Sequence, residues 1–312
     1  MEKMSCELLL HVHPKISEVE ELRFTYITNI VFNSFLSYTV IMLNIVTIHA
    51  MRKTLSLPKN LRTLLLSLAV SDVDVGLSIQ PFYTSLLVKW LQQNKPGCNI
   101  YVLFILLTSV FSVASFLGVV VVSVDRFLAI HLHLRYQELV TYKGVVSVVI
   151  SIWLLSVFFP SMIYWTAYNI HSLAALLLGV GSLVLTAIVN IKIYLTVQLH
   201  KNQIQALLVQ REAQTDEMAH FARFIKSAVS VFYVYVAFVV CYLPYFISMA
   251  VITTNGPNIA LKRFSLFSWS LINLNSSLNP VIYCWKMRHI RHAIMDILRN
   301  MSWLRNRASH LS

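Results

Sequence analysis

Seven long apolar runs divide this chain of 312 residues, and each is long enough to cross a lipid bilayer as a helix. Within lipid the backbone finds no water to hydrogen-bond, so a run of this kind folds as an α-helix. The sequence therefore predicts an all-α, polytopic membrane protein built around a bundle of seven transmembrane helices. The expected helices are 24–50, 61–88, 98–130, 142–165, 172–199, 221–252 and 264–285, with a tail at 1–23 before them and a segment at 286–312 after them.

The composition agrees with lipid as the main solvent. Hydrophobic residues make up 57% of the chain and charged residues only 12%, whereas about 25% of a soluble domain is charged. This balance excludes a soluble enzyme, a disordered chain, a collagen and a disulfide-rich secreted module. The net charge of +12 would suit nucleic acid only if the basic residues formed one face. They fall between the apolar runs instead, so we expect no nucleic-acid partner.

The distribution of Lys and Arg sets the expected orientation. An odd number of crossings places the two termini on opposite sides of the membrane. Most of the basic residues follow the first, third, fifth and seventh runs, so the positive-inside rule places the N-terminus outside and the C-terminus in the cytoplasm. After the last run, apolar residues recur at helical spacing between arginines, which predicts a short amphipathic eighth helix in the interface plane. They are Met287, Ile290, Ile294, Ile297, Leu298, Met301 and Leu304.

Polar side chains inside the expected helices are costly in lipid and are candidates for function. Asp72 lies in the middle of the second run, and a carboxylate there needs a cation or a proton. Five side chains could offer oxygen ligands to a hard cation if their helices face one another: Asp72, Ser115, Asn275, Ser276 and Asn279. The same groups would serve equally well as hydrogen bonds between helices, and polarity alone does not decide between the two.

Several short motifs follow one another through the expected helices. They are Asn44, Leu68-Ala69-Val70-Ser71-Asp72, Ser123-Val124-Asp125-Arg126-Phe127, Trp153, Tyr194, Cys241-Tyr242-Leu243-Pro244 and Asn279-Pro280-Val281-Ile282-Tyr283. With these motifs in this order, the chain resembles the rhodopsin-like (class A) G-protein-coupled receptors. The resemblance implies a plasma-membrane receptor rather than an enzyme, with an extracellular ligand, a heterotrimeric G protein and arrestin as partners. It implies no cofactor other than an allosteric sodium ion.

The resemblance also assigns roles in an activation switch. Asp125 would hold Arg126 at the cytoplasmic end of the third helix in the resting state. On activation, Arg126 would turn toward Tyr194 and Tyr283 as the sixth helix moves outward and opens a cleft for the G protein. Two prolines would act as hinges, because each removes a backbone hydrogen bond from its helix. The implied switch residues are Asp125, Arg126, Tyr194, Tyr242, Pro244, Asn279, Pro280 and Tyr283.

The sixth helix departs from the family pattern at two places. Tyr242 stands where the family usually has Trp. At the inner end of the helix many receptors have an acid that clamps Arg126, whereas this chain has Arg223 and Lys226 nearby and no acid within 219–224. Because like charges repel, we expect a weak clamp.

The outer loops depart from the pattern as well. The link at 166–171 is very short and has no Cys, so the usual bridge to the third helix cannot form. Cys98 could instead pair with Cys6 on the oxidising side, or it could be free. These features resemble the melanocortin, lysophospholipid, cannabinoid and adenosine receptor branch most closely, although Asn279 precedes Pro280 where melanocortin receptors have Asp.

By resemblance, the ligand pocket lies in the outer halves of the third, fifth, sixth and seventh helices. Its expected lining is Thr108, Ser109, Ser112, Leu178, Ser182, Tyr245, Phe246, Met249, Trp269 and Asn273. Amine receptors have an Asp where Thr108 stands, and opsins have a Lys where Asn273 stands. The neutral, partly aromatic lining favours a neutral ligand, lipid-like or purine-like, over a cation.

Two other functions stay open at this point. Five acids of the outer tail would suit a basic peptide, as in a receptor of melanocortin-like type: Glu2, Glu7, Glu18, Glu20 and Glu21. A seven-helix transporter or channel is the other alternative. It would normally show internal symmetry and a chain of titratable groups along a path, and the sequence shows neither pattern.

Overall fold

The computed structural model describes residues 18–54, 57–94, 96–132, 135–166, 168–208, 215–288, 290–297 and 299. Over these ranges every regular element is a helix. The helices are α2 (Val19–Lys53), α3 (Lys59–Asp74), η2 (Val75–Ile79), α4 (Gln80–Leu91), α5 (Cys98–His131), α6 (Tyr136–Leu139), α7 (Tyr142–Ser161), η4 (Met162–Tyr164), α8 (Tyr168–Leu208), α9 (Thr215–Asn255) and α10 (Ile259–Lys286). Because α3, η2 and α4 together make one crossing, the predicted seven-helix membrane fold is confirmed.

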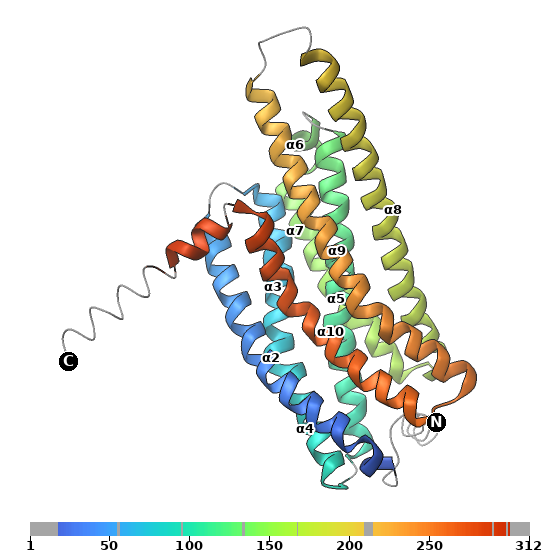
Figure 1. Ribbon diagram of the computed structural model, residues 1–312. Helices are drawn as coiled ribbons and strands as arrows, with labels where there is room; N and C mark the ends of the chain where they lie inside the picture. Colours follow the sequence, from blue (N-terminus) through green and yellow to red (C-terminus); the bar gives the residue numbers. More distant parts are fainter. Residues whose placement is uncertain are drawn as a thin grey trace, which may run out of the picture.

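Two helices extend well beyond the apolar runs that predicted them. The run at 172–199 lies inside α8, and the run at 221–252 lies inside α9. Hydropathy marks only the part of a helix that crosses lipid, whereas a polar extension in water can remain helical. The paired ends of α8 and α9 project past the other helices at the top of the bundle (Figure 1).

The last crossing is less apolar than the others. Among the described residues, six helical stretches are long and apolar enough to span a membrane, and α10 is not one of them. The reason is a row of buried Ser and Asn side chains on this helix: Ser268, Ser270, Asn273, Asn275, Ser276, Ser277 and Asn279. These groups lie inside the bundle rather than in lipid; some bond to neighbouring helices, as Asn273 does to Asn33, and others to their own helix, as Ser268 does to Phe264.

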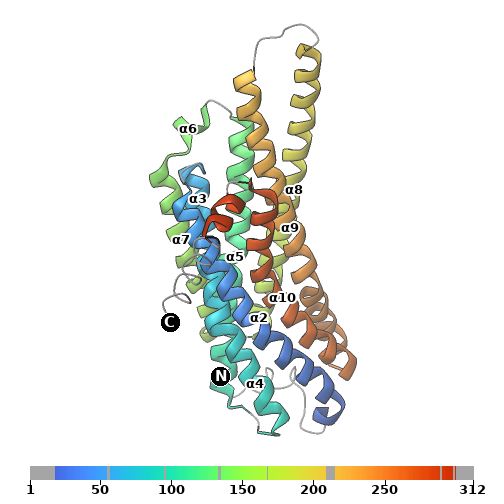
Figure 2. The same ribbon diagram turned by 60° about the vertical axis from the view of Figure 1, so that its left-hand side comes forward.

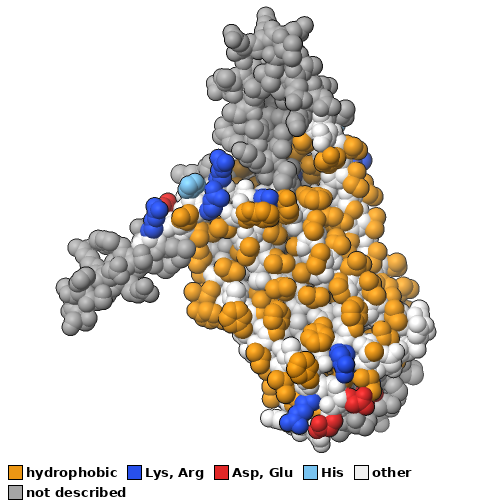
Figure 3. Space-filling view, in the orientation of Figure 1, with side chains coloured by type: hydrophobic (Ala, Val, Ile, Leu, Met, Phe, Trp, Pro, Cys, Tyr) orange, Lys and Arg blue, Asp and Glu red, His pale blue; other side chains and the backbone are white. Residues whose placement is uncertain are grey.

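The packing places α5 at the centre of the bundle and α10 between α2 and α9. α5 packs on α3, α7, α8 and α9, while α10 packs mainly on α9 and α2, and both arrangements can be followed in two views (Figure 1, Figure 2). On the face shown in Figure 3, apolar side chains form a broad band with Lys and Arg side chains above and below it. Large side chains such as Phe24, Phe35 and Leu154 are exposed there, as expected when the surrounding solvent is lipid.

The chain after α10 is helical again at 290–297. Ile290 is buried, and Ile294 and Ile297 pack against the inner core of the bundle. The segment leaves the bundle sideways after α10 (Figure 1). Leu298, Met301 and Leu304, which complete the predicted apolar stripe, lie outside the described residues.

Cys98, at the first turn of α5, is disulfide-bonded. Its candidate partner Cys6 lies outside the described residues, whereas Cys241 and Cys284 are free thiols. The alternative of a free Cys98 is therefore wrong for this structure.

Candidate functional site

A cavity of about 170 Å³ lies between α5, α7, α8, α9 and α10. It is placed toward the end of the bundle that holds the α7–α8 and α9–α10 turns (Figure 1). Its described lining is Thr108, Ser109, Ser112, Val113, Phe116, Phe159, Pro160, Met162, Thr166, Ile170, His171, Ala174, Ala175, Leu178, Gly179, Tyr242, Tyr245, Phe246, Met249, Trp269 and Ile272. This set has no Asp, Glu, Lys or Arg, so the cavity is neutral apart from His171.

Eight of the ten residues expected in a ligand pocket line this cavity, and two do not. The hydroxyl of Ser182 donates to the backbone oxygen of Leu178 on its own helix, at 2.7 Å. Asn273 is turned away to α2, where its side-chain amide donates to Asn33 at 2.9 Å. Sequence reasoning missed the contribution of α7 and its link, including Phe159 and Thr166, because no motif marks it.

Aromatic rings pack tightly at the inner end of the cavity. The ring centroids of Phe116 and Tyr242 are 4.5 Å apart, and those of Phe238 and Tyr242 are 5.3 Å apart. Phe246 packs on the same cluster and reaches Gly179 on α8, where an added Cβ would lie 2.2 Å from the phenylalanine ring. Tyr242 therefore joins the wall of the cavity to the aromatic core between α5 and α9.

Below the aromatic cluster, Asp72 is fully buried and belongs to a set of oxygens that lack donors. One carboxylate oxygen accepts from the side-chain amide of Asn279 at 2.9 Å, and Ser276 also lies close enough to hydrogen-bond the carboxylate. The other carboxylate oxygen and the side-chain oxygens of Asn44, Asn275 and Asn279 have no hydrogen-bond partner. Buried acceptors are almost always satisfied, so this group is an exception with a physical meaning. Ser115 is buried on α5.

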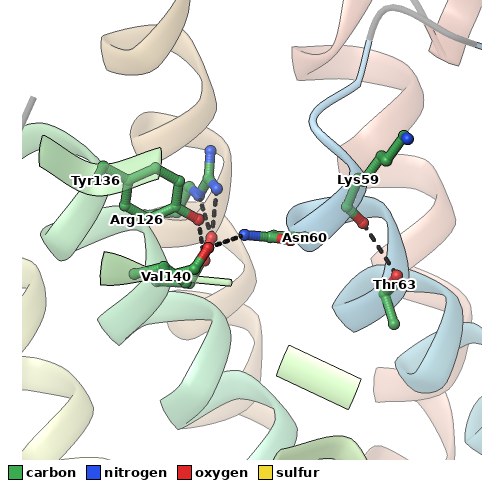
Figure 4. A network of polar contacts seen from close by, with 7 residues as sticks. Lys59, Asn60, Thr63, Arg126, Tyr136 and Val140 are labelled. Carbon is green, nitrogen blue, oxygen red and sulfur yellow. Dashed lines mark hydrogen bonds and ion pairs between the residues drawn. The ribbon is translucent and has the colours of Figure 1, made fainter. Parts of the chain in front are cut away.

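At the opposite end of α5, the carboxylate of Asp125 accepts hydrogen bonds from two residues. It accepts from the guanidinium of Arg126, with the Nε contact at 2.9 Å, and from the hydroxyl of Tyr136 on α6 at 2.5 Å. Burial, followed by the nearby Asp125 carboxylate, raises the pKa of Tyr136 to about 12, so its hydroxyl stays protonated and donates at neutral pH. Figure 4 shows Arg126 and Tyr136 converging at this point.

The loop that carries Tyr136 is also tied to α3. The side-chain amide of Asn60 donates to the backbone oxygen of Val140 at 2.9 Å (Figure 4). The sequence did not identify Tyr136 or Asn60, because a contact between a loop and two helices leaves no periodic signal.

The other expected switch residues lie on α8, α9 and α10. Tyr194 is 61% exposed on α8, and its hydroxyl accepts from Gln198. Tyr283 is buried, and its hydroxyl has no hydrogen-bond partner. Pro244 and Pro280 lie inside α9 and α10. The side chains of Arg223 and Lys226 lie outside the described part of the chain.

Comparison with known proteins supports the same fold. The family model for seven-transmembrane receptors of the rhodopsin family matches residues 43–174 and 160–283. The histamine H2 receptor of Canis lupus familiaris is 25% identical over 256 residues, which cover 75% of this chain and 69% of that receptor. Squid rhodopsin has a similar solved structure, with a TM-score of 0.76 over 89% of this chain and 86% of its own at 16% identity. Since the family match covers well over half of the sequence, the chain belongs to the rhodopsin family of seven-transmembrane receptors.

Proposed function

We propose that this receptor binds a neutral extracellular ligand in the cavity and activates heterotrimeric G proteins at the Asp125–Arg126 end. One observation carries the proposal: a single helix, α5, forms a wall of the cavity and holds the Asp125–Arg126 pair. Ser112 and Arg126 are 14 positions apart in the sequence, which is about 21 Å along a helix. A ligand that shifts α5 against α9 therefore acts on both ends together.

The orientation that we propose follows from two independent features. Basic residues gather at the end of the bundle that carries Asp125, which favours a cytoplasmic location. Cys98 at the opposite end is disulfide-bonded, and disulfides persist in the oxidising extracellular environment. The cavity then opens on the outer half of the membrane, as a receptor for an external ligand requires.

The charge of the cavity argues against a cationic ligand. The similarity to a histamine receptor raises an amine as a candidate, but an ammonium group in a buried site needs an anionic partner. No described lining residue supplies a carboxylate. Losing a charge-assisted hydrogen bond costs about 1.5–3 kcal/mol, so a lipid-like or purine-like molecule suits the cavity better.

A basic peptide, the melanocortin-like alternative, receives less support from the outer acids. Glu18 pairs with Lys262 at 2.6 Å, and Lys262 is only 3% exposed. Glu20 lies 3.7 Å from Arg23. Glu18 is therefore engaged within the protein, and Arg23 offsets the charge of Glu20, which leaves less net negative charge for a basic peptide.

Two further proposals, a bound sodium ion and a second cytoplasmic partner, rest on membership of the receptor family. We propose a sodium ion at Asp72, because a cation would satisfy the donor-free oxygens of Asp72, Asn275 and Asn279. Ser115 and Ser276 complete the proposed ligand set. Arrestin is proposed as a second partner at the cytoplasmic end.

The receptor function is tested by a G-protein dissociation screen in cells across neutral lipids, purines, amines and peptides. We expect a response to a member of one neutral class. Arg126→Ala should abolish that response while surface expression persists, because the guanidinium is the group that meets the G protein. The conservative change Phe127→Tyr, at the neighbouring position on α5, should retain it. A normal response from Arg126→Ala would overturn the proposed mechanism.

A further inference from the structure

In the half of the bundle that holds the cavity, the side formed by α2, α4 and α10 is closed by packed side chains. A cluster of buried residues fills the space between α2, α4 and α5, including Tyr26, Tyr83 and Phe104. Trp269 of α10 packs on Phe104 with ring centroids 5.5 Å apart. The buried pair of Lys262 with Glu18 joins α10 to the start of α2.

Hydrogen bonds between side chains of α2 and α10 continue this closed side along the two helices. The amide of Asn33 donates to the hydroxyl of Ser270 at 2.7 Å, and that hydroxyl in turn donates to Asn29. Asn273 adds the bond to Asn33 described above. Opening a path here would leave several buried polar groups without hydrogen-bond partners, which is unfavourable. A ligand is not expected to pass between α2 and α10.

On the opposite side of this half, α7 and α8 leave a gap in the wall of the bundle. α7 and α8 each pack on α5 and hardly on one another. Only a short link joins them, from Trp165 to the start of α8 at Tyr168. Small residues of α8, Ala174 and Ala175, line the cavity and are exposed at the same time. On either side of them, Phe159 is 37% exposed and Ile170 is 62% exposed.

These exposed residues face lipid rather than water. Ile170, Ala174 and Ala175 belong to the stretch Ile170–Gln198, which is apolar enough to span a membrane. Behind the gap, α5 presents the hydroxyl-bearing residues Thr108, Ser109 and Ser112 to the cavity. The path therefore runs from an apolar opening to a short row of neutral polar groups.

We propose that the cavity is entered sideways from the outer leaflet, through a gap between α7 and α8, by a neutral lipid with a hydroxyl, ester or amide group. Whether this lipid acts as an agonist rests on the proposed function; the lateral route itself does not. Such a lipid is already concentrated in the bilayer and brings no charge that the cavity would have to pair. Its apolar part suits the exposed side of α8, and its polar group suits the hydroxyls of α5.

The test follows the passage of a lipid-soluble reagent and needs no known ligand. Ser109→Cys provides a thiol on the far wall of the cavity, in a background of Cys241→Ser and Cys284→Ser that retains the disulfide of Cys98. The purified protein in nanodiscs is treated with N-dodecylmaleimide, which partitions into the bilayer, or with a charged, water-soluble maleimide. We expect the dodecyl reagent to modify the thiol faster.

A bulky residue at the gap should then block the reagent. Ala175→Trp is expected to slow labelling by dodecylmaleimide about tenfold, equivalent to about 1.4 kcal/mol in the barrier. Leu177→Trp is the matched control, because Leu177 is 64% exposed on the same helix and does not line the cavity. Ala174→Phe replaces Ala175→Trp if the latter lowers the melting temperature of the protein.

Three results would overturn the lateral path. They are a slowing no greater than that of Leu177→Trp, faster labelling by the charged reagent, and no labelling by either reagent. None of these measurements uses a G protein. If lateral labelling succeeds and the cell screen fails, the gap stands and the receptor proposal falls. If the screen succeeds and lateral labelling fails, the ligand reaches the cavity from water.

Discussion

At the scale of single residues, the most informative feature is a group of buried oxygens that lack hydrogen donors. Asp72 has one carboxylate oxygen paired with Asn279 and one unpaired. The amide of Asn44 is engaged with the backbone oxygen of Ser276 at 2.9 Å, so its own oxygen remains a free acceptor. The unpaired oxygens of Asp72 and of its partner Asn279 would suit the cation proposed above.

Sodium should therefore stabilise the receptor, and Asp72→Asn should remove the effect. A ligand present at ten times its dissociation constant adds about 1.4 kcal/mol to the stability of the state that binds it. We expect a higher melting temperature in sodium than in equal potassium or choline. The measurement is a thermal unfolding curve of the detergent-purified protein in each salt. A sodium effect that survives Asp72→Asn would exclude this site.

At the scale of helices, the approach of α8 to α9 depends on one glycine. An added Cβ at Gly179 would lie 2.2 Å from the ring of Phe246, whereas a Cβ at Gly181 would meet nothing within 4 Å. Both residues lie in α8. Substituting Ala at each position therefore separates the free-energy cost of crowding Phe246 from the free-energy gain of a better helix former.

Gly179→Ala should lower stability by about 1–3 kcal/mol, because the ring of Phe246 must move. Gly181→Ala should raise stability by up to about 1 kcal/mol, since alanine favours a helix over glycine. The melting temperatures of the two variants should thus shift in opposite directions from that of the wild type. Equal shifts would show that the contact between α8 and α9 does not limit the spacing of these helices.

The helical segment after α10 has a buried side and an exposed side. Ile294 packs against the core of the bundle, while Met295 is 45% exposed. A spin label at Ile294→Cys should therefore be strongly immobilised in anionic bilayers, and a label at Met295→Cys should be more mobile. Electron paramagnetic resonance line shapes report the difference. A freely tumbling label at Ile294 would contradict an eighth helix held along the membrane surface.

At the scale of the whole molecule, we propose that contacts at both ends of α5 hold the inactive state. Asp125 holds Arg126 and Tyr136 at the cytoplasmic end. At the cavity, a Tyr at position 242 replaces the usual Trp, and the inner end of α9 has no acid within 219–224. Fewer restraints on α9 should favour the active arrangement.

We therefore expect measurable activity without ligand. An inactive state favoured by about 3 kcal/mol leaves under about 1% of the receptor active, and losing about 1.4 kcal/mol raises that fraction about tenfold. The measurement is second-messenger level against receptor surface density in cells without added ligand. Phe224→Glu should lower the slope by giving Arg126 an acidic partner on α9 in addition to Asp125, whereas the neutral Phe224→Gln should lower it less. A flat line alongside an intact agonist response would refute the expectation.

The sequence alone determined the number, order and approximate position of the seven crossings, because the cost of placing polar backbone in lipid is a local property of each apolar run. It also determined the family, since the motif residues lie within single helices. The branch within the family remains a prediction, as do the sodium ion and the class of ligand.

The tertiary structure decided which side chains meet. Asn273 was expected in the pocket, yet it bonds to Asn33, a residue 240 positions away in the sequence. The contacts of Tyr136 with Asp125 and the gap between α7 and α8 likewise had no sequence signal. The physical reason is that the rotation and spacing of a helix are set by all of its neighbours together. A side chain's partner is therefore a property of the packed bundle and not of its own segment.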